Sequence, residues 1–193
     1  MTCPISPEVG PPSAFFRAHL HLVEETQTLG PVLDLACGRG RHARILVERG
    51  LHVVALDRDP SALEALREAV RGLPGSLEII EADLEDTTPP TLPAGSFGAI
   101  LVFRYLSRPL APWIVERLAP GGLLLYETFT RSQQSLGWGP RRDAFLLAPG
   151  ELRALFPTLE ELVYEEGLTD EPRPAQTARL LARRRVARGP ADP

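Results

Sequence analysis

Hydrophobic and polar positions follow two alternating patterns along this chain of 193 residues. Short runs of consecutive apolar residues are separated by segments in which apolar side chains recur every three or four positions. The apolar runs predict buried strands, and the wider spacing predicts amphipathic helices. Strands that alternate with helices favour a parallel sheet with helices packed on both faces.

The apolar runs predict five strands in the alternating part of the chain and two β-rich runs after it. The predicted strands are 31–36, 51–57, 76–82, 97–103, 121–129, 159–166 and 175–184. The last two are separated by turn residues, which predicts an antiparallel hairpin. The expected fold class is therefore α/β: a doubly wound, mostly parallel seven-stranded sheet with a C-terminal antiparallel hairpin.

Helices are predicted before and between these strands. The first covers 13–26, where Ser13 is a suitable N-cap and Phe16 and Val23 share one face. A short helix is predicted in 149–157, whereas 83–96 and 130–149 have no helical period and are predicted to be mainly loop. The other helical patterns, each with glycine at its end, are 41–50, 61–72 and 109–122.

The proline-rich and charged ends of the chain set the expected domain boundaries. Residues 1–12 contain four prolines and are predicted to form a flexible arm. Residues 13–185 are predicted to fold as one domain, and 186–193 to form a flexible tail.

Composition narrows the classes of function. A net charge of -4 and a pI near 5.6 argue against a nucleic-acid partner, and all 21 basic residues are arginine, which excludes a lysine Schiff base and a Walker-type lysine. The two cysteines are too few for a disulfide framework, and the four histidines have no metal-ligand spacing. With no secretory signal and no long apolar run, the protein is expected to be soluble and cytoplasmic, a monomer or homodimer without a membrane partner.

The most informative segment is 31–46, in which a buried strand turns through Gly38 and Gly40 into a helix. Glycine allows a ligand to approach the backbone closely, and a helix start offers free N–H groups. The pattern Gly38-x-Gly40-x-x-Ala43 also fits the dinucleotide-binding fingerprint. The loop alone therefore leaves the choice of nucleotide open.

Three carboxylates near this loop favour one kind of nucleotide over the other. Asp57 ends the second predicted strand, where it can accept hydrogen bonds from ribose hydroxyls. Asp34 lies within the first strand, and Asp83 follows the third, where it can accept a bond from an adenine amino group. Since Asp34 suits a positively charged ligand better than a diphosphate, the three together favour an adenosyl sulfonium compound.

At this point the chain resembles the class I S-adenosylmethionine-dependent methyltransferases. The resemblance rests on LDLACGRG at 33–40, ADLED at 82–86, FGAILVF at 97–103 and LAPGGLLLYETF at 118–129. The compact size, the first helix, PGELRALF at 149–156 and ARLLARR at 178–184 are similar to the tellurite-resistance and thiopurine methyltransferase-like group. The resemblance implies a single Rossmann-like domain with S-adenosyl-L-methionine as the cofactor.

It also implies roles for particular residues. The predicted cofactor-binding residues are Asp34, Ala36, Gly38 and Gly40 toward the methionine and sugar, Asp57 at the ribose, Arg58, Asp83 and Leu84 at the adenine, and Phe103 and Arg104 beside the reactive methyl group. Arg17, in the first helix, is assigned to the cofactor carboxylate from its charge. His19 and Tyr105 are the candidate catalytic residues for an acceptor that needs a base. No metal is predicted.

The expected function is methyl transfer to a small molecule through a sulfur, oxygen, nitrogen or chalcogen nucleophile. Two alternatives are compatible with the same residues. One is an NAD-dependent oxidoreductase, because the glycine pattern and Asp57 are shared with that class. The other is a non-catalytic S-adenosylmethionine-binding protein of the same fold, because fold does not determine function.

Overall fold

The computed structural model describes residues 9–86, 95–170 and 173–186. Residues 9–12 precede the first helix without regular secondary structure, and 184–186 follow the last strand in the same way. Most of the predicted arm, 1–12, and of the predicted tail, 186–193, lies outside the described residues. None of the described helices is long and apolar enough to cross a bilayer.

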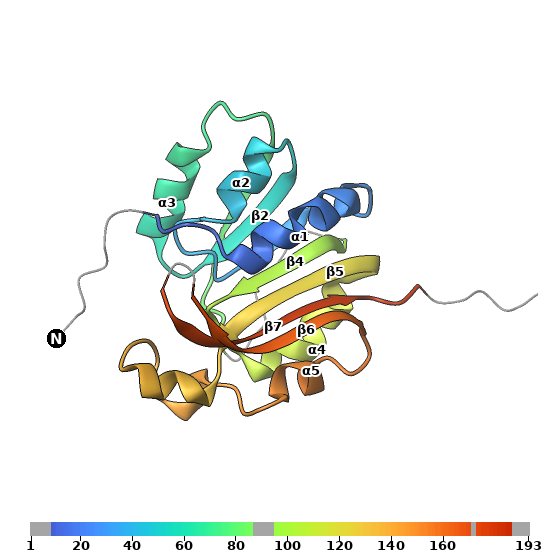
Figure 1. The fold of residues 1–193 in the computed structure, drawn as a ribbon. Helices are drawn as coiled ribbons and strands as arrows, with labels where there is room; N and C mark the ends of the chain where they lie inside the picture. The colour runs from blue at the N-terminus through green and yellow to red at the C-terminus, as the bar shows by residue number, and fades with distance from the viewer. Residues whose placement is uncertain (1–8, 87–94, 171–172, 187–193) are drawn as a thin grey trace, which may run out of the picture.

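A seven-stranded sheet forms the centre of the molecule (Figure 1). Its order is β3-β2-β1-β4-β5-β7-β6, in which β7 is antiparallel to both of its neighbours and the other pairs are parallel. This order confirms the predicted α/β class and the C-terminal hairpin. The strands are β1 Val32–Leu35, β2 His52–Asp57, β3 Ser76–Glu81, β4 Phe97–Phe103, β5 Leu118–Phe129, β6 Glu160–Thr169 and β7 Ala175–Arg183.

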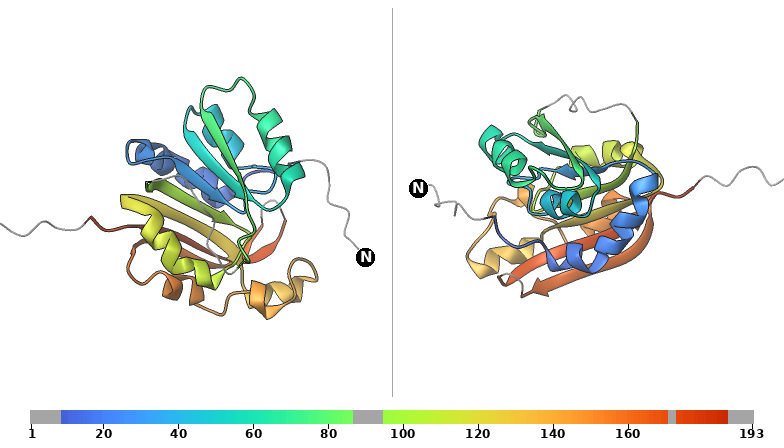
Figure 2. Two further views of the ribbon diagram at one scale, coloured as in Figure 1. Left: turned by 180° about the vertical axis from the view of Figure 1, so that it is seen from behind. Right: turned by 90° about the horizontal axis from the view of Figure 1, so that it is seen from above.

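Helices cover both faces of the sheet, as the views from behind and from above show (Figure 2). One face carries α1 Ala14–Glu25, α2 Ala43–Glu48 and α3 Pro60–Ala69, and the other carries α4 Ala111–Arg117 and α5 Glu151–Leu155. Short 3₁₀ segments complete the chain: η1 Thr26–Thr28, η2 Arg108–Leu110, η3 Arg131–Leu136 and η4 Asp143–Phe145.

Local sequence explains where these helices begin. The Ser13 hydroxyl accepts the Phe15 N–H at the start of α1, as its predicted role as N-cap requires. The Asp59 carboxylate accepts the N–H groups of Ser61 and Ala62 at the start of α3, with Pro60 in the first turn.

One boundary was predicted wrongly. The helical pattern at 109–122 predicts a helix to Gly122, but α4 ends at Arg117 and Leu118 already belongs to β5. Pro120 lacks an N–H group, and residues before a proline disfavour helical backbone angles. Leu118 is extended and pairs with Phe97 of β4.

The core lies on both sides of β1 and β4, the two central strands. All residues of both strands are buried. Successive side chains point to opposite faces, so Leu101 packs with the α1–α2–α3 layer while Ile100 packs with the α4–α5 layer. The sheet therefore holds the ends of β1 and β4 rigidly beside one another, and the functional loops follow these ends.

We predict that Leu101→Ala lowers the free energy of unfolding by about 2–5 kcal/mol, because Leu101 is 0% exposed and the cavity left behind cannot close. Urea denaturation followed by circular dichroism measures the effect. Leu168→Ala is the matched control, since Leu168 is 56% exposed and its loss should change stability by less than about 1 kcal/mol. Equal effects of the two substitutions would contradict this account of the core.

Candidate functional site

The loop after β1 has an unusual backbone. Ala36, Gly38 and Gly40 have φ angles of 53°, 54° and 72°, in the left-handed region. A Cβ atom at Gly40 would lie 2.3 Å from the Leu66 side chain, so glycine there allows α3 to pack closely. A Cβ atom at Gly38 would meet nothing within 4 Å, so the space in front of Gly38 is open.

Asp57 fixes the position of this loop. One of its carboxylate oxygens accepts the Gly38 N–H at 2.7 Å, and the other accepts the Asp59 N–H at 3.0 Å. Because Asp57 ends β2, these hydrogen bonds join the loop after β1 to the end of the neighbouring strand. The predicted ribose-binding carboxylate thus lies directly beside the glycine turn.

A cavity of about 190 Å³ opens next to Asp57. It gathers residues that follow β1, β2, β3 and β4 and that are far apart in the sequence. Its lining residues are Ala36, Asp57, Arg58, Ala82, Asp83, Leu84, Glu85 and Tyr105. Five predicted cofactor-binding residues therefore share one cavity.

Charge and polarity in this cavity are uneven. Arg58 lies 3.7 Å from an Asp83 oxygen and 3.9 Å from a Glu85 oxygen, and all three side chains are exposed. The Tyr105 hydroxyl is buried, and burial raises its pKa while a side-chain hydrogen bond with Ser107 acts in the opposite direction. Tyr105 thus lies with the residues predicted at the adenine.

Asp34 lies behind the loop, where it is 1% exposed. Its carboxylate accepts the Ala43 N–H at 3.2 Å, at the start of α2. Burial raises its pKa from 3.8 to about 7, although this hydrogen bond and the nearby Arg41 cation oppose the shift. Because Asp34 is about half protonated near neutral pH, any further charge placed beside it changes its protonation state.

A second group of polar side chains joins α1 to β5. The Ser13 hydroxyl donates to a Glu127 carboxylate oxygen at 2.5 Å, and the Ser13 N–H donates to His42 Nε2 at 3.2 Å. Since His42 Nε2 accepts, the proton of the neutral ring is assigned to Nδ1. Burial lowers the His42 pKa well below 6.5, and its ring packs against Phe16 and Phe103 with centroids 4.9 and 4.1 Å away.

Two half-buried arginines face Glu127. Burial lowers the pKa of both Arg41 and Arg104, while the Glu127 carboxylate acts in the opposite direction on each. Arg104 has a φ of 59°, and its N–H donates to the Glu127 carbonyl oxygen at 2.8 Å. Its guanidinium lies 5.2 Å from the Phe129 ring centre and 5.8 Å from that of Trp138.

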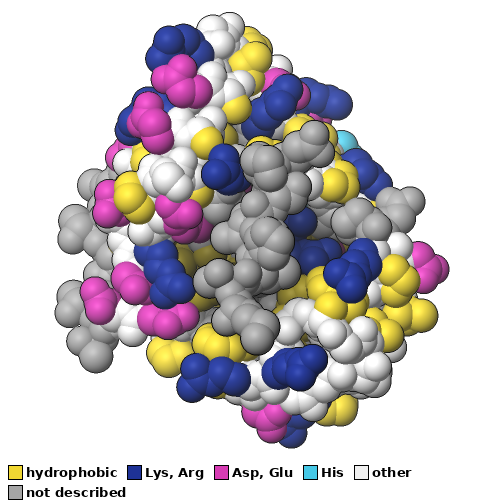
Figure 3. All heavy atoms as spheres, turned by 90° about the vertical axis from the view of Figure 1, so that its left-hand side faces the viewer, with side chains coloured by type: hydrophobic (Ala, Val, Ile, Leu, Met, Phe, Trp, Pro, Cys, Tyr) yellow, Lys and Arg dark blue, Asp and Glu magenta, His cyan; other side chains and the backbone are white. Residues whose placement is uncertain are grey.

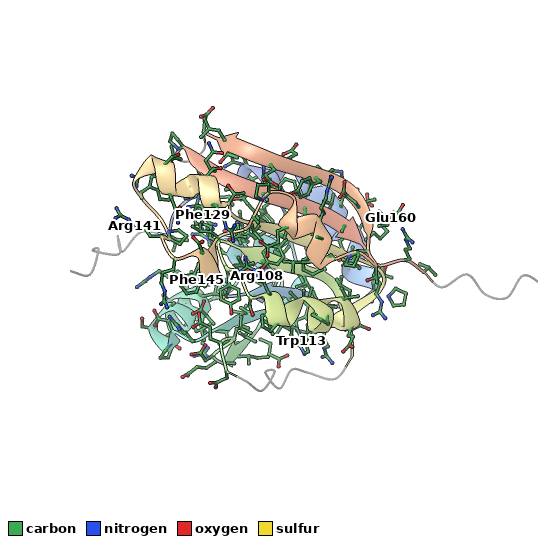
Figure 4. The ribbon with its side chains drawn as sticks, turned by 90° about the horizontal axis from the view of Figure 1, so that it is seen from below. Arg108, Trp113, Phe129, Arg141, Phe145 and Glu160 are labelled. Atoms are coloured by element: carbon green, nitrogen blue, oxygen red, sulfur yellow. The ribbon has the colours of Figure 1, made fainter. Side chains whose placement is uncertain are left out.

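Two polar side chains hold residues 130–149, the insertion between β5 and α5, in place. Arg108 donates to both Glu151 carboxylate oxygens and to the carbonyl oxygens of Ala144 and Leu146, and it lies near Phe145 in Figure 4. Gln133, which is 0% exposed, donates to the Trp138 carbonyl and accepts the Gln176 N–H.

The face where the parallel strands end is shown in Figure 3. Dark blue arginine side chains are spread over this face, and magenta acidic side chains lie mainly on its left. Arg41, Asp34, Glu127 and Arg104 are brought together by the loop after β1 and the ends of β4 and β5.

Arg17 and His19 are on α1. Arg17 occupies an exposed position on α1. The His19 ring contacts Phe15, and its Nδ1 lies 2.9 Å from the Phe15 carbonyl oxygen of the same helix. Neither residue lines the cavity beside Asp57.

Sequence reasoning missed Glu127, Arg41 and the contact made by Ser13. Glu127 had a visible signal, because it is a charged residue in the apolar run 123–129. Arg41 stands next to the glycine motif but has no feature that separates it from the neighbouring arginines. The contact of Ser13 joins residues 114 positions apart, and local patterns do not report such pairs.

Several known proteins are similar to this chain. A family model described as a methyltransferase domain matches residues 32–122. A trans-aconitate 2-methyltransferase from Sinorhizobium fredii is 37% identical over 99 residues, which are 49% of this chain and 37% of that protein. A ribosomal protein L11 methyltransferase from Pelobacter propionicus is 36% identical over 132 residues, 62% of this chain and 40% of that protein. The chain thus spans well under half the length of either curated relative.

Solved structures of other proteins share this fold. TehB from Haemophilus influenzae superimposes with a TM-score of 0.68 at 20% identity, covering 86% of this chain and 62% of that one. At this level of identity the similarity concerns the fold.

We predict that Asp34→Asn removes a pH-dependent loss of stability. Asp34 has a raised pKa in the folded protein, so the folded state is favoured while the carboxyl is protonated. Stability is therefore lost as pH rises from about 4 to about 7. At neutral pH the variant should be more stable than the unsubstituted protein by up to about 4 kcal/mol, with little difference at pH 4. Urea titrations across this range test it, and parallel stability profiles would contradict it.

Proposed function

Since this chain belongs to the class I S-adenosylmethionine-dependent methyltransferases, we propose that it transfers the methyl group of S-adenosylmethionine to a small-molecule acceptor. The observation that carries the proposal is the hydrogen bond that joins the open glycine turn to Asp57, which lines the cavity beside it. Asp34, Arg41 and Glu127 are buried or half-buried charged residues near the same turn. The cavity suits a nucleoside, and the buried charges suit an amino acid.

The first cavity fits the adenosine half of the cofactor. Asp57 would hold the ribose, Asp83 and Leu84 the adenine, and Arg58 the open side of the ring. The space in front of Gly38, which a Cβ atom would begin to fill, supports close approach of the ligand to the backbone. The buried Tyr105 hydroxyl is a further polar group in the same cavity.

The buried charges fit the methionine half. Asp34 would balance its ammonium group, directly or through water, and this contact would lower the raised pKa of Asp34. Arg41 is a half-buried cation suited to the carboxylate, in addition to Arg17, which is assigned to that group from its charge. The diphosphate of NAD is negatively charged, so the Asp34 carboxylate would repel it rather than balance it. This disfavours the NAD-dependent alternative.

The cofactor, when bound, supplies a methyl group on a positively charged sulfur. The protein then has to position the acceptor and exclude water. Phe103 ends β4, Arg104 follows it, and both would lie beside the reactive methyl group. The Ser13–Glu127 hydrogen bond holds the start of α1 against the end of β5. For a hydroxyl or amine acceptor, His19 and Tyr105 remain the candidate bases.

Two observations favour a small acceptor. A second cavity, of about 180 Å³, is lined by Ser13, Glu127, Arg179 and Asp170 among others, and α1 and the β6–β7 hairpin border it. The net charge of -4 does not favour binding of RNA. The relatives named above are a trans-aconitate methyltransferase and a ribosomal protein methyltransferase, so assays of methyl transfer must include both classes of acceptor.

We expect S-adenosylmethionine and its demethylated product to bind in isothermal calorimetry and to raise the melting temperature, whereas NAD does neither. Gly38→Ala should weaken this binding by about tenfold or more, because the added methyl group enters the ligand space. The strain should cost only about 1 kcal/mol of stability.

Gly72→Ala is the matched control. Gly72 has a φ of 79° and open space around its Cβ position, as at Gly38, but it follows α3 away from the cavity. It should show the same loss of stability with unchanged affinity. Binding of NAD alone would instead support the oxidoreductase alternative.

We also expect radiolabelled methyl transfer to at least one compound in a panel of thiols, small hydroxyls, amines and chalcogen oxyanions, and none to total RNA or ribosomal proteins. Filter and chromatographic assays with the same labelled cofactor test both classes together. Transfer to a macromolecule alone would refute a small-molecule acceptor, and tight cofactor binding without transfer to any acceptor would favour the non-catalytic alternative.

A further inference from the structure

Three polar side chains near the end of β5 have no hydrogen-bond partner for a buried atom among the described residues. They are Arg104 at Nε, Thr177 at Oγ1 and Arg179 at Nε. Two of these atoms belong to guanidinium groups, which only donate, and the third is a hydroxyl. Leaving buried donors unsatisfied costs about 1–3 kcal/mol each. Such a cluster is unfavourable unless a ligand completes it.

Strand register places two of these side chains, Thr177 and Arg179, on one face. Thr177 pairs with Phe129, and Arg179 pairs with Glu127. Leu125 and Leu181, which pair one step further along, both pack in the α1–α2–α3 layer, and side chains two positions apart share a face.

Arg104 reaches the same face from β4. Its guanidinium lies over the Phe129 ring, and its N–H bonds the Glu127 carbonyl. The three unsatisfied groups therefore surround Glu127 and Phe129.

The backbone at Arg104 supports a functional reason for this arrangement. A non-glycine residue with a φ of 59° costs free energy, and such strain is concentrated at functional sites. The strained residue is held between a buried strand and a ring pair, Phe129 and Trp138, whose centroids lie 5.6 Å apart. The fold thus keeps a cation, with an unused donor, at the edge of the proposed reaction site.

The charges around these donors are already partly paired. Glu165 lies 3.1 Å from an Arg179 Nη2 atom, and Glu127 accepts the Ser13 hydroxyl. Arg104 has no carboxylate within ion-pair distance among the described residues, although Glu127 influences its pKa. Arg104 is therefore the arginine of this group most available to a ligand, and a ligand with accepting oxygens matches its donors.

We propose that Arg104, supported by Thr177 and Arg179, binds an anionic group of the methyl acceptor, such as a carboxylate or an inorganic oxyanion. This inference rests on the proposed methyltransferase function and defines its substrate class. An anion bound here would lie beside the Phe129 and Trp138 rings, so an acceptor with a flat apolar body and an acidic group is favoured. A neutral analogue of the same shape would leave the donors unsatisfied.

Trp138 provides a direct readout. In a Trp113→Phe background it is the single tryptophan, and it lies next to the Arg104 guanidinium. We would titrate this protein with benzoate, benzamide and sulfate while recording tryptophan fluorescence, with and without saturating demethylated cofactor. We expect a saturable change with benzoate at a dissociation constant about tenfold or more below that for benzamide. A response to sulfate would identify an oxyanion site, and a response to benzoate alone a carboxylate site.

Substitutions assign the effect to Arg104. Arg104→Gln should weaken benzoate binding by about tenfold or more, and Arg104→Lys, which keeps the charge, by less. Arg131→Gln removes an exposed arginine of the insertion, 4.0 Å from Asp143, and should change nothing. Thermal denaturation checks that each variant is folded.

The outcomes separate this proposal from the proposed function. Equal binding of benzoate and benzamide, or unchanged benzoate binding in folded Arg104→Gln, overturns the anion site even if the cofactor binds normally. Loss of cofactor affinity in Arg104→Gln, with benzoate binding retained, assigns Arg104 to the cofactor carboxylate and also overturns it. Failure of the unsubstituted protein to bind the cofactor in calorimetry refutes the methyltransferase function, while the titration without cofactor still tests the anion site.

Discussion

The hydrogen bond from the Gly38 N–H to Asp57 is the interaction on which the site depends. The central position of β1 means that the chain must leave it between two neighbouring strands, and it does so through left-handed residues at 36, 38 and 40. These three residues are alanine and glycine, so their own side chains contribute little to holding the turn in place. Asp57 supplies the missing restraint from the adjacent strand, so the shape of the loop is preserved before any ligand arrives.

Polar groups are buried at this end of the sheet at a cost to stability. Asp34, His42 and Glu127 are all buried, and the pKa shifts of the first two show that charge is disfavoured there. The helix layers on the two faces of the sheet are filled by apolar side chains. This division suits an enzyme, because the groups that destabilise the fold are those that a charged ligand would stabilise.

Much of the fold was predictable because local patterns decide it. All seven strands lie close to their predicted ranges, since continuous apolar runs and alternating helices have few other solutions. The end of α4 was missed because a helical pattern and a proline competed within a few residues. The cavity residues from Ala36 to Leu84 were predictable, because each follows a strand end in a recognisable motif. The arrangement around Glu127 was not, since it depends on strand pairing between distant segments and on the turn at Arg104.

The contacts of Ser13 also have a practical consequence for work with this protein. Residues 9–12 lead into α1 beside Glu127, whereas β7 ends at the far side of the sheet, near Gly121 and Gly122 (Figure 1). A purification tag or fluorescent fusion joined ahead of α1 would therefore be tethered beside the second cavity, which Ser13 and Glu127 line, and could obstruct small ligands there. Attachment after β7 keeps foreign sequence about a full strand length away.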